Sequence, residues 1–554
     1  MEVVLTPWRR LVRLLQLDSR DIRQVIYYAV FAGLVALTLP LGIQAIINLL
    51  QGATISTSWI VLIVLVTLGV IFQGVLQFMQ VRILENIQQK VFTRASFEFA
   101  YRFPKLSMEQ IRDQYPPELA NRFFDILTVQ KGLPKIVLDY PAALLQIIFS
   151  LILLSLYHPF FIAYGILLLL LVFLVFKFTF ARGMKTSLLE SKAKYKVAHW
   201  LQEVARSLVS FKLSGRTSLA MDRNNELTDK YLQYRESHFR ILMQQYIQMI
   251  GFKVLVTAGL LVIGGVLVLN NQMNIGQFVA AEIIILLVIS SVEKLITGLD
   301  SFYDVLTSLE KIGQVVDIPL ERKDGTPPPP TTMPWNLQLE RVGLDKDNGI
   351  PLLKDVNVSI QTGDHIRIIG PPGSGKSSLL KMITGLIRPS SGAIYLNDNP
   401  IRGTNLRQLR SHMGQVLPEQ MPFEGTILEN ITFGAKDIPM ERVMSVIRAM
   451  GLQDFVREKK NGVNDILLSQ GQRIPHTVSK KILLARAVVH MPQILILKNA
   501  LEHFDLQEAE RIMTYLCHAD QPWMLVVSSP LEQWKNHTNR TLTIEDGTLT
   551  EILV

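Results

Sequence analysis

Long apolar stretches alternate with polar stretches over about the first 300 residues of the chain. Six predominantly apolar segments are each long enough to cross a bilayer as a helix: residues 25–50, 59–79, 137–157, 160–180, 246–269 and 275–296. Pro40 interrupts the first of these segments, and we expect it to kink that helix rather than end it. The pattern predicts a membrane α-helical domain of six transmembrane helices.

The connections between these segments differ in length and charge. Those at 51–58, 158–159 and 270–274 are short and nearly uncharged, whereas 80–136 and 181–245 are long and carry most of the Lys and Arg. By the positive-inside rule the long connections and both termini are cytoplasmic, which predicts a multi-pass protein of the inner (cytoplasmic) membrane. Apolar residues in the long connections recur at helical spacing, so we expect helices that extend beyond the membrane.

The pattern changes after the last apolar segment. Residues up to about 316 are amphipathic, and Lys323-Asp-Gly-Thr followed by four prolines then interrupts all regular structure as a linker. From Trp335 onward, strand-like and helix-like runs alternate, as in an α/β nucleotide-binding domain. We predict a transmembrane domain at 1–316, a Pro-rich linker at 317–334 and an α/β P-loop domain at 335–554.

The strongest chemical signal is Gly-Pro-Pro-Gly-Ser-Gly-Lys-Ser-Ser at residues 370–378. It fits the phosphate-binding P-loop, and it lies between a predicted buried strand (364–369) and a predicted helix (377–386), as that motif requires. A glycine-rich turn without a ligand is the alternative, and the flanking strand and helix argue against it. In a P-loop the backbone N–H groups bind phosphate, the lysine reaches the terminal phosphates and the serine faces Mg²⁺. The predicted cofactor-binding residues are Gly370, Gly373, Ser374, Gly375, Lys376, Ser377 and Ser378, with Ser377 as the candidate Mg²⁺ ligand.

Composition and charge support a membrane protein. Mean hydropathy is +0.27 with 19% charged residues, which is too apolar for a purely soluble chain. The net charge of +9 comes without a basic run interleaved with aromatics, so anionic lipid rather than nucleic acid accounts for it. The single cysteine, Cys517, excludes an intramolecular disulfide and a Cys-based zinc site. The residues before Arg20 have the pattern of an amphipathic helix at the lipid interface.

Glu282 and Lys253 are two of the ionisable residues that fall inside predicted transmembrane segments. Glu282 either faces a substrate pathway or lies in water near the outer end of its helix. Lys253 has a flexible stem that can reach the membrane surface. The sequence does not decide whether the two residues pair.

Six spans with long intracellular helices, a linker and a P-loop domain resemble a half-transporter of the ABC exporter family. Further matching pieces are Gly-Thr-Ile-Leu-Glu-Asn-Ile at 425–431, Ala-Arg-Ala at 485–487 and the apolar strand at 494–497. The resemblance implies ATP as the cofactor, bound between two head-to-tail nucleotide domains. It implies that the turns at 115–122 and 215–222 contact those domains. Residues 138–155 resemble exporters of type I secretion systems.

The chain departs from the family at the Walker B carboxylates. The apolar strand at 494–497 is followed by Lys498 and Asn499, where the family has the aspartate that positions Mg²⁺ and the glutamate that polarises the attacking water. We therefore predict that no catalytic residue remains at these two positions, and that the Lys498 ammonium disfavours Mg²⁺ and neutralises phosphate charge in its place. Asp505 keeps the place of the family's D-loop aspartate.

The other family positions are altered as well. The run Leu-Ser-Gln-Gly-Gln at 468–472 looks like the signature sequence, but twelve residues separate it from Ala485, which is too many. Family spacing instead places the signature on residues 474–478, where no glycine remains and where His476 is either a phosphate donor or a structural residue. By the same counting the glutamine of the Q-loop falls on Pro418, the switch histidine on Ser529 and the adenine-stacking aromatic on Lys346.

Two functions from different classes follow. The first is a non-hydrolysing or partner-dependent transport component of ABC exporter type, and the second is an active ATP-driven exporter for type I secretion or for small-molecule or lipid efflux. We expect a homodimer or a pair with another ABC half-transporter, a periplasmic adaptor protein and membrane lipids as partners, and no nucleic acid.

Overall fold

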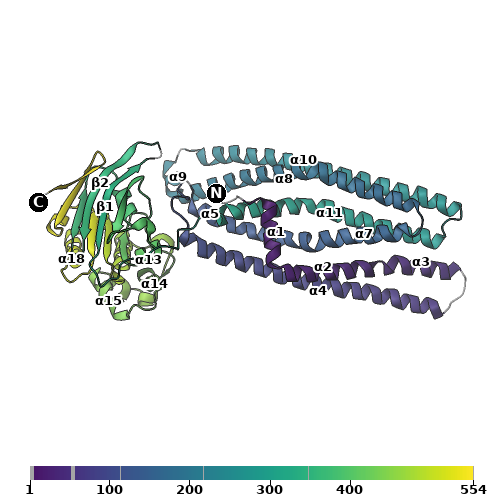
Figure 1. Ribbon diagram of the computed structural model, residues 1–554, viewed down its shortest axis with the longest axis horizontal. Helices are drawn as coiled ribbons and strands as arrows, with labels where there is room; N and C mark the ends of the chain where they lie inside the picture. The colour runs from purple at the N-terminus through teal and green to yellow at the C-terminus, as the bar shows by residue number, and fades with distance from the viewer. Residues whose placement is uncertain (1–4, 52–56, 113, 216, 347, 553–554) are drawn as a thin grey trace. The chain divides into compact units, whose positions relative to one another are not determined.

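The computed structural model describes residues 5–51, 57–112, 114–215, 217–346 and 348–552. The chain divides into two compact units, the first formed by Met1–Lys105 with Asp113–Ile318 and the second by Leu106–Arg112 with Pro319–Val554. Figure 1 draws the first unit as helices and the second as sheets with surrounding helices. Each unit is described in turn.

The first unit is entirely helical in the residues described. Its α-helices are α1 (Pro7–Leu17), α2 (Ser19–Ala36), α3 (Thr38–Gln51), α4 (Thr57–Arg102), α5 (Pro116–Asn121), α6 (Asp125–Pro134), α7 (Tyr140–Ser155), α8 (Phe160–Arg206), α9 (Leu208–Ser214), α10 (Leu219–Leu269) and α11 (Ile275–Val316). A short π-helical stretch, Lys135–Asp139, joins α6 to α7.

Six helical stretches among the described residues are long and apolar enough to span a membrane, which confirms the predicted membrane domain. They extend beyond the predicted apolar segments, since α4, α8, α10 and α11 continue unbroken for 42 to 51 residues. Helix α8 packs along α10, α2 along α4, and α11 against α3, α6 and α7. Half of the most apolar window of α11 is buried, so α11 forms the centre of the unit.

Pro40 acts largely as expected. Helix α2 ends at Ala36 and α3 begins at Thr38, and the Thr38 hydroxyl donates to the carbonyl of Val35 at 2.7 Å. The carbonyl that Pro40 leaves without its helical N–H donor is that of Ala36, so the Thr38 bond satisfies the carbonyl beside it. The first connection, predicted at 51–58, lies mostly outside the described residues.

Helices α10 and α11 are joined by an ion pair that the sequence did not specify. Lys253 on α10 donates to Glu293 on α11 at 2.6 Å. Glu282 is exposed on α11, eleven positions before Glu293, and no ion pair of Glu282 occurs among the described residues. The partner of Lys253 is thus Glu293.

The second unit is an α/β domain. Its strands are β1 (Asn336–Asp345), β2 (Pro351–Gln361), β3 (His365–Ile369), β4 (Ser391–Leu396), β5 (Asn399–Pro400), β6 (Met413–Val416), β7 (Gly425–Thr426), β8 (Ile466–Leu467), β9 (Ile494–Lys498), β10 (Met524–Ser528), β11 (Arg540–Glu545) and β12 (Thr548–Ile552). Its helices are α12 (Lys376–Ile383), α13 (Leu406–Ser411), α14 (Ile427–Thr432), α15 (Met440–Ala449), α16 (Gln453–Arg457), α17 (His476–Val489) and α18 (Leu506–Leu516).

Two larger sheets organise this unit. One has the order β12-β11-β3-β10-β9-β6, with all strands parallel except β12, and the other is antiparallel with the order β2-β1-β4-β5. Strand β9 begins with four consecutive apolar residues, which are all fully buried, as expected for a parallel strand covered on both faces. The predicted α/β fold is therefore confirmed.

Two segments outside the predicted 335–554 domain belong to this unit. In the linker, the N–H of Thr326 donates to the carbonyl of Gly403 at 2.9 Å, and Arg410 pairs with Glu321 at 2.7 Å. The segment Leu106–Arg112 bridges to Leu320, and its Glu109 lies 3.7 Å from Arg388. The turn predicted to contact the nucleotide domain, 115–122, forms α5 in the first unit; in the turn predicted at 215–222, Arg216 is outside the described residues.

Candidate functional site

The residues of the candidate site follow four neighbouring strands of the parallel sheet. The P-loop follows β3, Lys498 ends β9, Ser529 follows β10 and Glu419 lies shortly after β6. Because these strands are parallel, their carboxyl ends meet at one edge, where open α/β sheets bind ligands. The fold therefore brings together residues that are more than 150 positions apart in the sequence.

The P-loop has the backbone shape that phosphate binding requires. It runs from the end of β3 to the start of α12, and Gly370 and Gly375 have φ of +143° and +100°. A Cβ on Gly370 would lie 2.4 Å from the carbonyl oxygen of Ile544, and one on Gly375 would lie 2.8 Å from the Cδ2 of Leu353. Both positions thus demand glycine. The loop leads into a helix N-terminus, so the residues present fit the phosphates of ATP.

Lys376 folds back onto this loop. Its ammonium donates to the carbonyls of Gly370 and Pro371, at 2.7 Å each, and lies 3.3 Å from the hydroxyl of Ser374. Burial and the nearby charge of Lys498 both lower the pKa of Lys376. These loop contacts are ones that a phosphate group can replace, since its oxygens are stronger acceptors for a charged donor.

Lys498 contacts the residue predicted to face a metal ion. Its ammonium donates to the hydroxyl oxygen of Ser377. Burial lowers the pKa of Lys498, with Glu419 opposing that shift and Lys381 adding to it. The sequence placed Lys498 after an apolar strand, and the strand order explains why it reaches the P-loop: only β10 lies between β9 and β3.

The residues around Ser377 do not fit Mg²⁺. This ion requires octahedral oxygen ligands, commonly with one or two carboxylates. Among the described residues no cluster of three or more His, Cys, Asp or Glu side chains is suited to a metal. A divalent cation about 4 Å from the Lys498 ammonium would be repelled by roughly 8 kcal/mol at an effective dielectric of about 20.

The carboxylate nearest to the predicted Q-loop is already paired. Glu419 accepts a hydrogen bond from Lys381 on α12 at 2.6 Å. Burial alone raises the pKa of Glu419, but this hydrogen bond and the charges of Lys381 and Lys498 bring it below its ordinary value. Gln420 accepts from the backbone N–H of Leu417 at 3.0 Å, so it is held within its own turn.

The helix expected to carry the signature begins at the predicted position. Helix α17 starts at His476 after Pro475, whereas the signature-like run forms a separate turn at Ser469–Gly471. No side chain caps α17. The rings of His476 and His503 lie edge to face at 4.9 Å, and burial, Lys480 and His503 lower the pKa of His476.

A carboxylate that sequence reasoning missed follows β9. Glu502 accepts a hydrogen bond from the hydroxyl of Ser529 at 2.9 Å, and its second oxygen is buried without a partner among the described residues. Glu502 is the single acidic residue between Asn499 and Asp505, and this was the feature of the sequence that could have identified it as a site residue. Asp505 caps α18 by accepting from the N–H of Gln507 at 2.9 Å.

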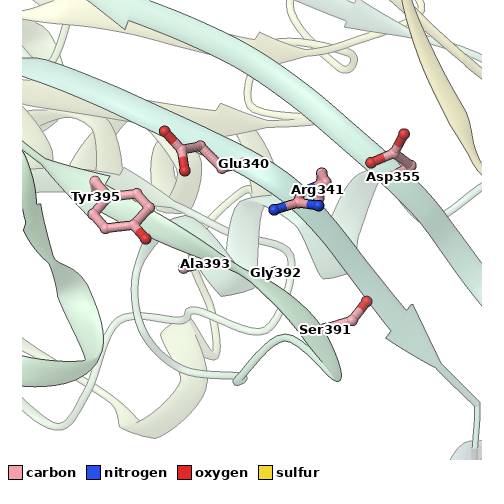
Figure 2. Close-up of a pocket in the computed structure, with 7 residues that line it drawn as sticks. All are labelled: Glu340, Arg341, Asp355, Ser391, Gly392, Ala393 and Tyr395. Carbon is pink, nitrogen blue, oxygen red and sulfur yellow. The ribbon is translucent and has the colours of Figure 1, made fainter.

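A separate groove of about 470 Å³ lies on the antiparallel sheet. Figure 2 shows its lining, with Arg341 drawn between Glu340 and Asp355. Its other lining residues are Ser391, Gly392, Ala393 and Tyr395. None of these residues belongs to the P-loop, and no sequence motif pointed to them.

Comparisons with known proteins agree with this arrangement. Residues 25–292 match the family described as the ABC transporter transmembrane region, and residues 353–502 match the family described as ABC transporter. In structure the chain is similar to a bacterial Atm1-family ABC exporter with ATP bound, with a TM-score of 0.84, 15% sequence identity and coverage of 96% of this chain and 94% of that one.

Curated relatives match a part of the chain. The alpha-hemolysin translocation ATP-binding protein HlyB of Escherichia coli O157:H7 is 30% identical over 331 residues, which is 58% of this chain and 46% of HlyB. The leukotoxin translocation ATP-binding protein LktB of Mannheimia haemolytica is 29% identical over the same shares. The chain thus matches about half the length of these relatives. With a transmembrane region followed by an ATP-binding domain, the chain belongs to the ABC transporter family and has the architecture of an exporter-type half-transporter.

Proposed function

We propose that this half-transporter works in the inner (cytoplasmic) membrane and binds ATP without hydrolysing it. The observation that carries the proposal is the hydrogen bond from the Lys498 ammonium to the Ser377 hydroxyl, at the position where hydrolysis needs a metal ion. The intact P-loop supports nucleotide binding, and the side chains around it argue against turnover.

Phosphoryl transfer by P-loop enzymes requires a metal ion on the phosphates and a group that orients the attacking water. At the end of β9 this chain has an ammonium and an amide, in Lys498 and Asn499. The carboxylate of Glu419 is engaged by Lys381. Losing one well-placed group typically costs about a hundredfold in rate, and such groups act as a unit, so several losses leave essentially background hydrolysis.

The same proposal includes assembly and topology. Helix α4 exposes a continuous apolar surface that includes Ile71, Phe72 and Phe78, which lipid or a second copy of the chain would cover. A homodimer is the default by symmetry, and another ABC half-transporter or a periplasmic adaptor protein are the other partners proposed. Both termini and both long connections are placed in the cytoplasm.

A steady-state ATPase assay on the purified full-length protein in lipid tests the proposal. We expect a rate at background for the native chain and for Lys376→Ala alike. Mg²⁺-dependent turnover of about 1 s⁻¹ or more that Lys376→Ala abolishes would refute it, since such rates are ordinary for enzymes.

A double variant tests whether the residues after β9 alone account for the proposed loss of ATP hydrolysis. Lys498→Asp with Asn499→Glu restores two carboxylates after β9 but leaves Pro475, His476 and Thr477 at the start of α17. We expect no recovery of turnover, because the β-branched Thr477 keeps phosphate away from that helix N-terminus. Full recovery would show that the sequence after β9 is the sole defect.

The alternative function is an active exporter, and Glu502 is the observation that favours it. Its unpartnered buried oxygen lies in the loop that follows β9, where a base for the attacking water would be needed. If the native protein hydrolyses ATP, Glu502→Gln tests whether Glu502 is the base. Loss of the hydrolysis rate in this variant would assign that role to Glu502. The names of the two relatives, which refer to translocation of hemolysin and leukotoxin, make a polypeptide the first substrate class to test.

A further inference from the structure

We propose that Lys498 is a built-in counter-cation, so that the P-loop binds the metal-free triphosphate group of a nucleotide and Mg²⁺ competes with that binding. The inference rests on the proposed nucleotide binding and adds the chemical form of the ligand. It starts from the misfit between the residues around Ser377 and a magnesium ion.

Lys498 is held at this position by the strand that carries it. Strand β9 lies inside the parallel sheet, paired with β10 on one side and β6 on the other, and its residues 494–497 are fully buried. In the ladder Lys498 is opposite Ser528 at the carboxyl edge. The position of the Lys498 stem is therefore set by the core of the domain and not by a surface loop.

The ammonium of Lys498 has donors to spare. A lysine offers three N–H donors, and the hydroxyl of Ser377 is the one hydrogen-bond acceptor that Lys498 has among the described residues. The remaining donors are available to phosphate oxygens that bind next to Ser377. Lys498 thus supplies the positive charge and the contacts that a metal ion would otherwise supply.

Charge favours the metal-free ligand. The ammonium groups of Lys376 and Lys498 both bond to P-loop residues, and an anion between them relieves their mutual repulsion. Mg²⁺ bound to a triphosphate cancels part of its negative charge, so the magnesium complex is attracted less by these lysines. If Ser377 were to hold the Mg²⁺ of that complex, Lys498 would first have to leave the hydroxyl oxygen of Ser377, to which it already donates.

Isothermal titration of ATP into the full-length protein in lipid nanodiscs tests the inference, with one series in EDTA and one in millimolar Mg²⁺. The native chain is expected to bind ATP at least as tightly in EDTA as in Mg²⁺. Lys498→Met removes a charged donor and is expected to weaken binding in EDTA by about tenfold or more. Lys498→Asp is expected to reverse the preference, so that Mg²⁺ tightens binding.

Lys381→Met is the matched control, because it removes a lysine of the same domain that is bonded to Glu419 and not to Ser377. It is expected to change the affinity equally in EDTA and in Mg²⁺. Thermal melting of each variant establishes that it is folded, and Lys498→Asp and Lys498→Met provide two independent substitutions.

Three results would overturn the inference. These are native binding that is tighter in Mg²⁺ than in EDTA, unchanged metal-free affinity in folded Lys498→Met, and absence of ATP binding in both media. The first two leave the proposed lack of hydrolysis intact, whereas turnover in the ATPase assay would refute that proposal whichever form of ATP binds.

Discussion

Replacing Asn430 by leucine provides a sharp test of how the ATP-binding domain is held together. Asn430 is fully buried at the fourth position of α14. Its side-chain oxygen accepts from the N–H of Phe423 and from the guanidinium of Arg486, each at 2.9 Å. Its amide nitrogen donates to the carbonyls of Phe423 and Thr426, at 2.9 and 3.1 Å. One side chain thus joins the loop before α14 to helix α17.

The size of the effect follows from these contacts. Asn430→Leu has a similar volume but leaves two carbonyls, one backbone N–H and one guanidinium N–H without partners. An unsatisfied buried group costs about 1 to 3 kcal/mol, and the lower figure for each gives a total of about 4 kcal/mol. For a domain of this size that is a fall of about 8 to 16 °C in melting temperature.

Tryptophan fluorescence during heating of the full-length protein in nanodiscs measures this change. Trp335, Trp523 and Trp534 are all buried in the ATP-binding unit and report its unfolding. Thr426→Ala is the control within the same motif: it breaks a capping box with Glu429 and is expected to cost only about 1 kcal/mol. An Asn430→Leu protein that melts within about 2 °C of the native chain would refute the reasoning.

Three further predictions concern titration, reactivity and topology. Burial lowers the pKa of His365 and of His412 below 6.5, so the unfolded chain binds more protons. The contribution of these two histidines to the stability of the ATP-binding unit is therefore present above about pH 6.5 and is lost as the pH falls through their lowered pKa values. The pH dependence of the melting temperature of this unit, which is expected to be smaller in His365→Gln, checks this. Burial raises the pKa of Cys517 to about 12, so mass spectrometry is expected to find this thiol unalkylated in the native protein at pH 8 and alkylated after denaturation; rapid native labelling would contradict this. In a Cys517→Ser background, Asn271→Cys is expected to react with an impermeant reagent from outside the cell and Pro329→Cys is not, whereas the reverse pattern would invert the proposed topology.

The membrane helices were predictable because their signal is local. An apolar run of about 20 residues specifies a spanning helix without reference to any other part of the chain. The extent of each helix was less accessible, since α4 and α10 continue for many residues as mixed polar sequence. The pairing of Lys253 with Glu293 depends on the relative placement of α10 and α11 and could not be obtained from either helix alone.

At the candidate site the sequence identified residues but not their contacts. The P-loop between a strand and a helix, and Lys498 after a buried strand, follow from patterns in neighbouring residues. The hydrogen bond between Lys498 and Ser377 depends on the strand order β3-β10-β9, which joins segments distant in sequence. Glu502 was missed for the same reason, because its partner Ser529 follows a different strand.

The segment 425–431 shows why resemblance and physical explanation differ. It was identified by its likeness to a family motif, and the structure supplies the reason for its residue types. Thr426 and Glu429 form a reciprocal cap on α14, and Asn430 satisfies buried backbone groups of the preceding loop. These are structural tasks that do not depend on hydrolysis, so no catalytic role is needed to explain the residue types of this motif.

The residues that determine the fold of this chain are different from those that determine the chemistry of its candidate site. Four buried apolar residues determine where β9 lies, and they place whatever follows it beside the P-loop, a carboxylate or an ammonium alike. A nucleotide that binds without being hydrolysed can shift the membrane helices only by its difference in affinity for their conformations. Such a chain responds to nucleotide concentration but supplies no net work per cycle. Transport against a gradient would therefore require energy from another source, which an active half-transporter could supply as partner and a homodimer of this chain could not.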